Sequence, residues 1–203
     1  MIRLIRGDSF ASDIPASEMI FTDPPFETDG RKLAELFARI DYRHLVLICS
    51  QHQALDFYKH SENITFGFDM IVSHVSPKKS RSYHQPNMLH SNILYFRRNG
   101  VGSAFDRRRV ERQDVFGADG YYPSIFHAPK TGLNYRYQKN QQMLNALLGA
   151  FDVGFVCDPF AGSGSTALAM LENGISDGIM IEKNADAFAL MRKQLALFAA
   201  VES

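Results

Sequence analysis

A glycine-rich loop near the end of the sequence constrains the fold more than any other feature. It occupies residues 158–166 (Asp-Pro-Phe-Ala-Gly-Ser-Gly-Ser-Thr), between the apolar run Val153–Cys157 and a stretch of helical character. Small residues let a ligand approach the backbone closely, and the first turn of a helix presents unpaired N–H groups. Only 39 residues follow Gly164. Since a nucleotide-binding sheet normally continues through several strands after its glycine loop, we expect the remaining strands to come from the N-terminal half, in a circularly shifted order.

The next predicted strand ends on an acid. Glu182 lies 18 residues after Gly164. A carboxylate at this point can accept hydrogen bonds from both hydroxyls of a ribose, so we expect the unit to bind a nucleoside. The spacing Gly-x-Gly-x-x-Ala that begins at Gly162 is also permitted in dinucleotide-binding proteins, which leaves the nucleoside open. The lack of a Lys before Ser165 excludes a phosphate-binding P-loop.

Short apolar runs alternate with helical stretches along most of the chain. The predicted strands are Ile2–Arg6, Glu18–Thr22, His44–Ser50, Asp69–Val75, Asn92–Arg97, Val153–Cys157 and Gly178–Ile181. The predicted helices are Gly30–Ile40, Gln53–His60, Gln138–Phe151, Ser165–Asn173 and Ala185–Ala200. This alternation predicts an α/β fold whose mostly parallel sheet, of about seven strands, is covered by helices on both faces. The strands Asp69–Val75 and Asn92–Arg97 have no helical pattern between them, which predicts a late antiparallel hairpin.

The composition favours a globular protein. The chain is 45% hydrophobic and 22% charged, which is enough apolar material for a core and too little charge for a disordered protein. Its apolar runs are shorter than the ~20 residues of a membrane-spanning helix, and its first residues lack the pattern of a signal peptide. Cys49 and Cys157 lie in apolar runs without a second Cys or His at ligand spacing. We therefore expect buried thiols, no metal site and a cytoplasmic protein.

Charge is distributed unevenly although the net charge is zero. Residues 78–139 contain twelve Lys or Arg and four Asp or Glu, and the flanking parts are acidic. Periodicity fails over residues 99–134, where we expect an irregular insert. The basic middle favours a surface that faces a polyanion, although a solvated charged face would give the same pattern.

Two consecutive prolines end another predicted strand. Asp23-Pro24-Pro25-Phe26 follows Glu18–Thr22. Proline cannot continue a β-ladder, and the pair fixes an extended turn at the carboxyl end of the strand, where open α/β sheets bind their ligands. A Pro-Pro turn alone would be only structural. The acid before it and the aromatic residue after it add a carboxylate, a backbone carbonyl and a stacking surface.

The two loops together resemble those of a known family. Asp-Pro-Pro-aromatic and Asp-Pro-Phe-x-Gly-x-Gly are the catalytic and cofactor loops of the amino-methyltransferases that methylate exocyclic amines of DNA bases with S-adenosylmethionine. Here the catalytic loop at Asp23 precedes the cofactor loop at Asp158, an order that resembles the β-group of these enzymes. The resemblance covers residues 1–98 and 135–200, and it implies a Rossmann-like methyltransferase sheet.

The resemblance implies a role for each matching residue. The predicted catalytic residues are Asp23, Pro24, Pro25 and Phe26. The predicted cofactor-binding residues are Asp8, Asp23, Lys139, Asp158, Phe160, Ala161, Gly162, Gly164, Ser165, Thr166 and Glu182. Asp8 matches an acid that contacts the cofactor's adenine. Lys139 belongs to a segment over the cofactor's methionine end, where Asn140 replaces the family's Pro.

The resemblance also implies a substrate. Members with Asp in the first position of the catalytic loop usually act on adenine N6, and those with Ser act on cytosine N4, so Asp23 favours adenine. Phe26 stands where Tyr is commoner and keeps the stacking surface. We expect residues 1–98 and 135–203 to form the catalytic domain and the basic insert 99–134 to recognise double-stranded DNA. The predicted nucleic-acid-binding residues are Lys78, Lys79, Arg81, Arg107, Arg108 and Arg109.

Several alternatives stay open at this point. The same chemistry would serve cytosine N4 or an RNA adenine, and a non-catalytic relative would bind DNA with the same fold. A nicotinamide-dependent oxidoreductase would use the glycine loop but would leave Asp23–Phe26 unexplained. Small β-group enzymes often pair to cover a duplex, which makes a homodimer a further expectation. The sequence does not say whether a restriction nuclease accompanies the enzyme.

Overall fold

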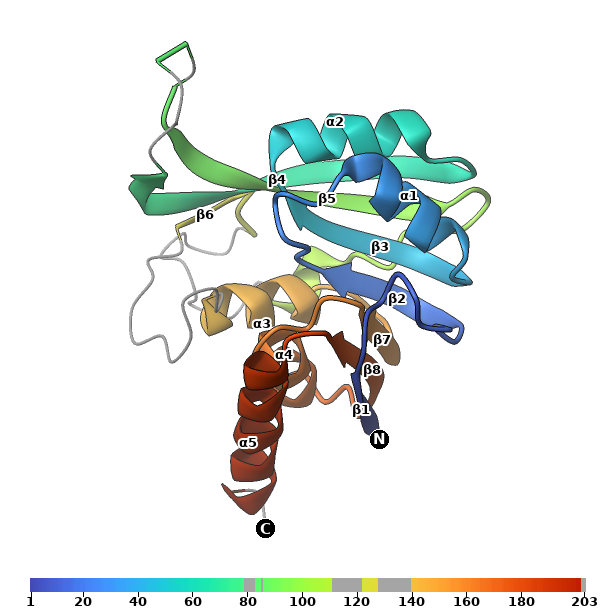
Figure 1. Cartoon of the computed structure of the whole chain (residues 1–203), viewed down its shortest axis with the longest axis vertical. Coiled ribbons are helices and arrows are strands. Elements are labelled where there is room, and N and C mark those ends of the chain that lie inside the picture. The colour runs from blue at the N-terminus through green and yellow to red at the C-terminus, as the bar shows by residue number, and fades with distance from the viewer. Residues whose placement is uncertain (79–82, 85, 111–121, 128–139, 202–203) are drawn as a thin grey trace.

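An eight-stranded sheet forms the centre of the computed structural model, which describes residues 1–78, 83–84, 86–110, 122–127 and 140–201. In spatial order the strands are β1 (Ile2–Arg6), β8 (Asp177–Glu182), β7 (Phe155–Asp158), β2 (Ser17–Thr22), β3 (Tyr42–Cys49), β5 (Met88–Arg98), β4 (Ile64–Lys78) and β6 (Ile125–His127). The strands from β1 to β3 in this order are parallel, β5 is antiparallel to both of its neighbours, and β6 is parallel to β4. The predicted α/β class, the mostly parallel sheet and the antiparallel hairpin of β4 and β5 are confirmed (Figure 1).

The pairing of β7 confirms the circular shift. This strand precedes the glycine loop, and it pairs in parallel with β2 from the N-terminal part of the chain, with Met19 opposite Val156 and Ile20 opposite Cys157. On its other side β7 pairs with β8, which in turn pairs with β1. Strands from the two ends of the chain therefore alternate in the middle of one sheet.

Helices cover both faces of the sheet. On one face lie α1 (Gly30–Ala38) and α2 (Gln51–His60), and on the other lie α3 (Gln141–Gly149), α4 (Ser165–Glu172) and α5 (Ala185–Val201) (Figure 1). The central strands bury side chains on both sides, because successive residues of a strand point to opposite faces. In β3, Leu45 and Leu47 belong to the core under α1 and α2, whereas Val46 and Ile48 belong to the core under α3 and α4.

The structure corrects two details of the prediction. The hairpin is longer than expected, since β4 has 15 residues and β5 has 11. The eighth strand is β6, which falls inside the segment 99–134 that was expected to be irregular. A three-residue strand is too short to show a period in sequence.

Part of the predicted insert packs into the core. The ring of Phe105 lies 4.7 Å from that of Phe68 and 5.3 Å from that of Phe151, between ring centroids. Phe126 in β6 is fully buried, and the Tyr122 ring packs edge-to-face against it. These described residues therefore support the second core, and the division of the chain into a domain and an insert stays a prediction.

Other global predictions concern burial. Both cysteines are free and buried, as expected. Burial raises the pKa of the Cys49 thiol to about 12 and also raises the pKa of the Cys157 thiol. Within the described ranges, every helix is too short or too polar to span a membrane.

Candidate active site

The parallel strands deliver four predicted segments to one edge of the sheet, which we call the carboxyl edge. Asp8 follows β1, Asp23 follows β2, Asp158 ends β7 and Glu182 ends β8. All four strands run in the same direction, so their ends meet although the segments lie far apart in sequence. The arrowheads of β2 and β3 mark this edge in Figure 1.

Asp158 joins the two loops that the sequence singled out. Its Oδ1 accepts hydrogen bonds from Thr22 Oγ1 at 2.7 Å and from the Phe160 N–H at 3.0 Å. Its Oδ2 accepts one from Thr166 Oγ1 at 2.6 Å. Thr22 directly precedes the Asp-Pro-Pro-Phe loop, whereas Thr166 lies in the first turn of α4. The carboxylate therefore holds the catalytic and glycine loops together, and its predicted contact with a cofactor stays a prediction.

The setting of Asp158 shifts its titration. Its side chain is 2% exposed. Burial raises the pKa of Asp158 to about 6, the nearby charge of Asp23 acts in the same direction, and the hydrogen bonds from Thr166, Thr22 and Phe160 oppose the shift. A buried carboxylate is costly unless hydrogen bonds satisfy it, and three donors do so here.

The glycine loop has the backbone that its sequence predicted. Gly162 and Gly164 have φ angles of +54° and +91°, a region that other residues rarely adopt. Gly164 is the N-cap of α4, and a Cβ at this position would lie 2.6 Å from Met191 Cγ on α5. At Gly162 an added Cβ would meet nothing within 4 Å. The loop is therefore closely packed on the α5 side and open at Gly162.

Glu182 lies against this loop, as the spacing predicted. Its Oε2 accepts a hydrogen bond from the Gly162 N–H at 2.7 Å, and its Oε1 accepts one from the Asn184 N–H at 2.6 Å. The carboxylate is therefore oriented by two backbone donors at the end of β8, and it is half-buried. A ribose-binding acid would need this position beside the glycine loop.

Asp8 lies on the neighbouring loop and is also held in place. Its Oδ2 accepts from Lys183 Nζ at 2.7 Å, and its Oδ1 accepts from the Phe10 N–H at 3.1 Å. These contacts, with the Lys183 bond the largest cause, lower the pKa of Asp8. The Phe10 ring packs edge-to-face on Phe160, with centroids 5.8 Å apart, and Ser9 donates to the Pro159 carbonyl. The loop after β1 thus forms one wall beside the glycine loop.

The catalytic loop turns sharply after β2. Asp23 and Phe26 are half-buried, Pro24 is buried and Pro25 is exposed. The Thr28 N–H donates to the Pro25 carbonyl at 2.8 Å, which closes a turn that contains Phe26. The carboxylate of Asp23 is close enough to raise the pKa of both Asp158 and Cys49. The predicted catalytic and cofactor segments are therefore neighbours.

The sequence analysis missed two residues that hold this loop. Thr22 anchors its start through Asp158. Gln53 in α2 anchors its turn, because Nε2 donates to the Pro25 carbonyl at 3.1 Å and to the Thr28 carbonyl at 2.8 Å. Neither residue carries a sequence signal for this role, since each contact joins elements far apart in the chain.

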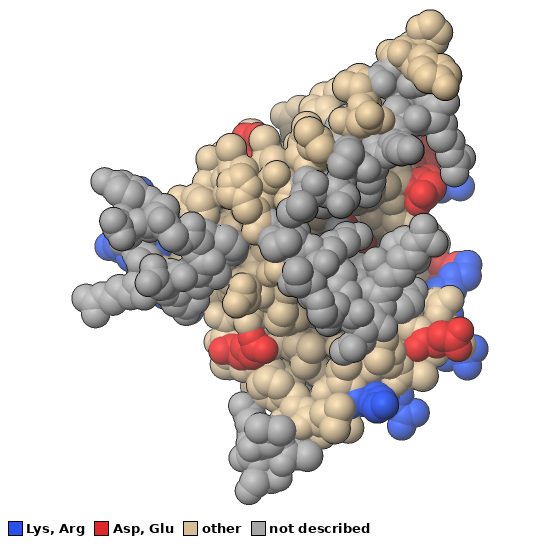
Figure 2. Space-filling view, turned by 90° about the vertical axis from the view of Figure 1, so that its left-hand side faces the viewer, with Lys and Arg blue, Asp and Glu red and all other residues tan. Residues whose placement is uncertain are grey.

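Several predicted site residues lie outside the described residues. These are Lys79, Arg81 and Lys139. Lys78 is the last residue of β4, and since β4 is parallel to β3 it lies toward the carboxyl edge. Figure 2 views the side with the hairpin tip, and its described Lys and Arg side chains lie near the margin beside Asp and Glu. The predicted basic surface stays a prediction.

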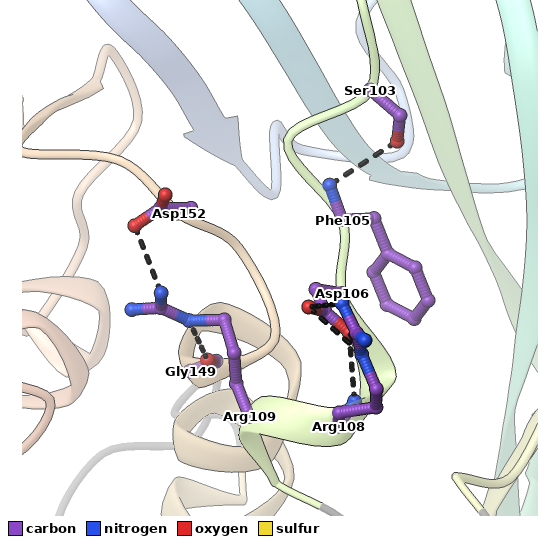
Figure 3. A network of polar contacts seen from close by, with 7 residues as sticks. All are labelled: Ser103, Phe105, Asp106, Arg108, Arg109, Gly149 and Asp152. Carbon is purple, nitrogen blue, oxygen red and sulfur yellow. Dashed lines mark hydrogen bonds and ion pairs between the residues drawn. The ribbon is translucent and has the colours of Figure 1, made fainter.

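The structure places Arg107, Arg108 and Arg109 at the opposite edge of the sheet, which we call the amino edge. Arg108 makes a bidentate pair with Asp106, with a shortest distance of 2.7 Å. Arg109 pairs with Asp152 at 2.8 Å and donates to the Gly149 carbonyl (Figure 3). The position of the cluster argues against contact with a base held at the catalytic loop.

A cavity of about 530 Å³ lies beside this cluster. Its lining includes Glu18 and His44, which lie near the starts of β2 and β3. The cavity is therefore at the amino edge and is remote from the glycine loop. The positive φ angles and the convergent loops make the carboxyl edge the candidate active site.

Comparisons with solved structures identify the fold. The M1.HpyAVI–SAM complex aligns with a TM-score of 0.72 at 17% identity, over 96% of this chain and 100% of that chain. TTHA0409 from Thermus thermophilus, described as a DNA modification methylase and complexed with S-adenosyl-L-methionine, aligns with a TM-score of 0.68 at 17% identity, over 97% and 93%. The cytosine-N4-specific PvuII DNA methyltransferase aligns with a TM-score of 0.70 at 12% identity, over 94% and 85%.

These identities establish a shared fold. The chain has the α/β fold of solved DNA methyltransferases, over nearly its full length. No protein-family profile and no curated protein sequence matches it.

Proposed function

We propose that the protein is an S-adenosylmethionine-dependent DNA methyltransferase that acts on the exocyclic N6 amine of adenine. The observation that carries the proposal is the hydrogen bond between Thr22 and Asp158, at 2.7 Å, which joins the Asp-Pro-Pro-Phe loop to the glycine loop. The fold supports it, since two of the similar structures hold S-adenosylmethionine and PvuII is a DNA methyltransferase.

The residues at the carboxyl edge fit this cofactor. Gly162 leaves open space where a Cβ would stand, and Glu182 lies beside it with an oriented carboxylate. Glu182 would hold the ribose hydroxyls, and Asp8 would contact the adenine. The remaining predicted contacts would come from the loop of residues 158–166 and from Lys139. When bound, S-adenosylmethionine supplies an electrophilic methyl group.

The catalytic loop would activate the amine through hydrogen bonding. The lone pair of an exocyclic amine is delocalised into the base, which makes it a poor nucleophile. The Asp23 carboxylate and the Pro24 carbonyl would accept hydrogen bonds from the amine, favour a localised lone pair and stabilise the positive charge that develops on nitrogen. Phe26 would stack on the flipped base. Most of the rate would come from positioning and electrostatics, because the proton becomes acidic only after the methyl group has moved.

The choice of base rests on Asp23. Asp in this position favours adenine by resemblance, whereas PvuII is cytosine-N4-specific and shares the fold. Double-stranded DNA as the substrate, a homodimer, a cytoplasmic location and a place in a restriction–modification pair belong to the same proposal.

Nucleoside mass spectrometry tests the proposal directly. Unmethylated duplex DNA and RNA are each incubated with the protein and S-adenosylmethionine, and the methylated nucleosides are quantified. We expect N6-methyladenine from DNA, a loss of about 10³-fold in Asp23→Ala, and wild-type yield in Asp152→Ala, a matched control at the amino edge. N4-methylcytosine would overturn the base assignment, product on RNA alone would overturn the substrate, and product from Asp23→Ala at wild-type yield would overturn the mechanism.

A further inference from the structure

Gln53 is a buried polar residue that the proposed mechanism does not use. It lies in the first turn of α2 and is 2% exposed. Its side-chain N–H groups donate to the carbonyls of Pro25 and Thr28, at 3.1 and 2.8 Å. The residues between these two acceptors are Phe26 and Glu27. One amide therefore fixes both ends of the turn that contains Phe26.

The backbone of Gln53 is fixed as well. Ser50 is the N-cap of α2 and accepts a hydrogen bond from the Gln53 N–H at 3.2 Å. Gly30, at the start of α1, packs so closely that a Cβ there would lie 2.6 Å from the Gln53 carbonyl oxygen. The donor is thus set on two packed helices, and the acceptors lie on the loop. A side chain held in this way transmits the position of the helices to the turn.

The far end of the catalytic loop has its own anchor. Thr22 donates to Asp158 at 2.7 Å, just before Asp23 and Pro24. Asp23 and Pro24 therefore lie between a hydrogen-bonded residue on one side and the turn held by Gln53 on the other. Two fixed points that flank a short, proline-rich segment leave it little freedom, because proline already fixes its own φ.

We propose that Gln53 is a positioning residue for methyl transfer, because its side-chain amide holds the turn that presents Phe26 and the adjoining Asp23-Pro24 pair in one geometry. The inference rests on the proposed function. A displacement of about 1 Å at a reacting group costs on the order of 10²-fold in rate. Loss of the two hydrogen bonds therefore lowers kcat and leaves the affinity for S-adenosylmethionine unchanged, since the glycine loop keeps its own contacts.

The test compares three variants of the full chain. Gln53→Met removes both donors and keeps a similar length, and Gln53→Glu keeps the shape but presents a carboxylate to the two carbonyls. Gln51→Met is the matched control, because Gln51 is exposed on the same helix and its Oε1 accepts from Asn92 on β5. The measurements are kcat on unmethylated DNA, the Kd of S-adenosylmethionine, and amide hydrogen exchange over residues 23–29.

We expect kcat to fall by about 10- to 100-fold in Gln53→Met, with exchange at least about tenfold faster over residues 23–29 and the cofactor Kd within twofold of wild type. Gln53→Glu behaves likewise at neutral pH and regains activity relative to wild type as pH falls, because a protonated carboxyl donates one hydrogen bond. A residue that served only stability would not give this pH profile. Gln51→Met matches wild type.

Other outcomes decide against the inference. A folded Gln53→Met variant with wild-type kcat overturns it, whether or not exchange changes, and so does a fall in kcat with wild-type exchange over the turn. If Gln53→Met does not fold, Gln53→Glu decides through its pH profile. If the wild-type protein methylates neither DNA nor RNA, the proposed function fails, and the exchange measurement then decides whether Gln53 holds the turn.

Discussion

The two edges of the sheet use charged residues in opposite ways. At the carboxyl edge, the carboxylates of Asp158 and Glu182 accept hydrogen bonds from backbone N–H groups and threonine hydroxyls of neighbouring loops. At the amino edge, Asp106 and Asp152 pair with Arg108 and Arg109 (Figure 3). The first pattern fixes loops around open backbone, and the second neutralises charge at the surface. The difference teaches that a cluster of arginines is a weaker sign of a functional site than a carboxylate that organises loops.

The largest expected contrast is in the pH dependence of stability. The pKa of Asp158 is raised to about 6, and the ordinary value is about 3.9. Because the folded value is the higher one, the stabilising contribution is fully present below pH ~4 and is lost as the pH rises through 6. A shift of about two units corresponds to roughly 3 kcal/mol. Asp158→Asn should remove this loss, as measured by urea unfolding between pH 4 and 7.

Asp106 should behave with the opposite sign. Hydrogen bonds from Arg108 lower its pKa to about 2, so its contribution is present above pH ~4 and is lost as the pH falls through 2. Asp106→Asn should flatten only the acid limb of the stability profile. If the two variants changed the same limb, the contrast between the edges would be wrong.

A smaller effect is expected from two glycines that flank α4. At Gly164 an Ala would meet both an unfavourable φ of +91° and the Met191 side chain at 2.6 Å, so Gly164→Ala should cost about 2–3 kcal/mol. At Gly174, φ is +73° but the space is open, and Gly174→Ala should cost about 1 kcal/mol. Thermal unfolding measures both costs. Calorimetry with S-adenosylmethionine should show weaker binding only in Gly164→Ala, and equal losses of affinity would count against a ligand site at the glycine loop.

The smallest effect is expected at the amino edge. Arg108→Gln removes an exposed ion pair and should change the free energy of unfolding by less than about 0.5 kcal/mol. It should also leave DNA affinity and its salt dependence unchanged. A salt slope reduced by about one would show that Arg108 contacts a phosphate, and the amino edge would then belong to the nucleic-acid interface.

Glycine and proline made the two main loops predictable from sequence. Gly162 and Gly164 occur where the backbone has positive φ, and Pro24 and Pro25 occur where the ladder of β2 ends. Both constraints are local, so they are readable without the fold. The alternation of β3, whose neighbouring residues enter opposite cores, is local in the same sense and predicted a strand buried on both faces.

The contacts that organise the site were not predictable, because they join distant segments. Ser50 and Gln53 have the spacing of a capping box, which would turn the Gln53 side chain back onto its own helix. It instead reaches Pro25, 28 residues away. Asp158 bonds Thr22 across 136 residues. Likewise, basic residues at 107–109 suggested a polyanion surface, and only the fold shows that Arg109 pairs with Asp152.

Asp158 gives the two loops a shared thermodynamic element. Its carboxylate accepts from Thr22 on one side and from Thr166 on the other. A ligand at the glycine loop that strengthens these hydrogen bonds raises the affinity of the catalytic loop for its substrate by some factor. By reciprocity, the substrate raises the affinity for that ligand by the same factor. Cooperativity between the two binding events would then depend on one buried carboxylate, with no change of shape in the sheet.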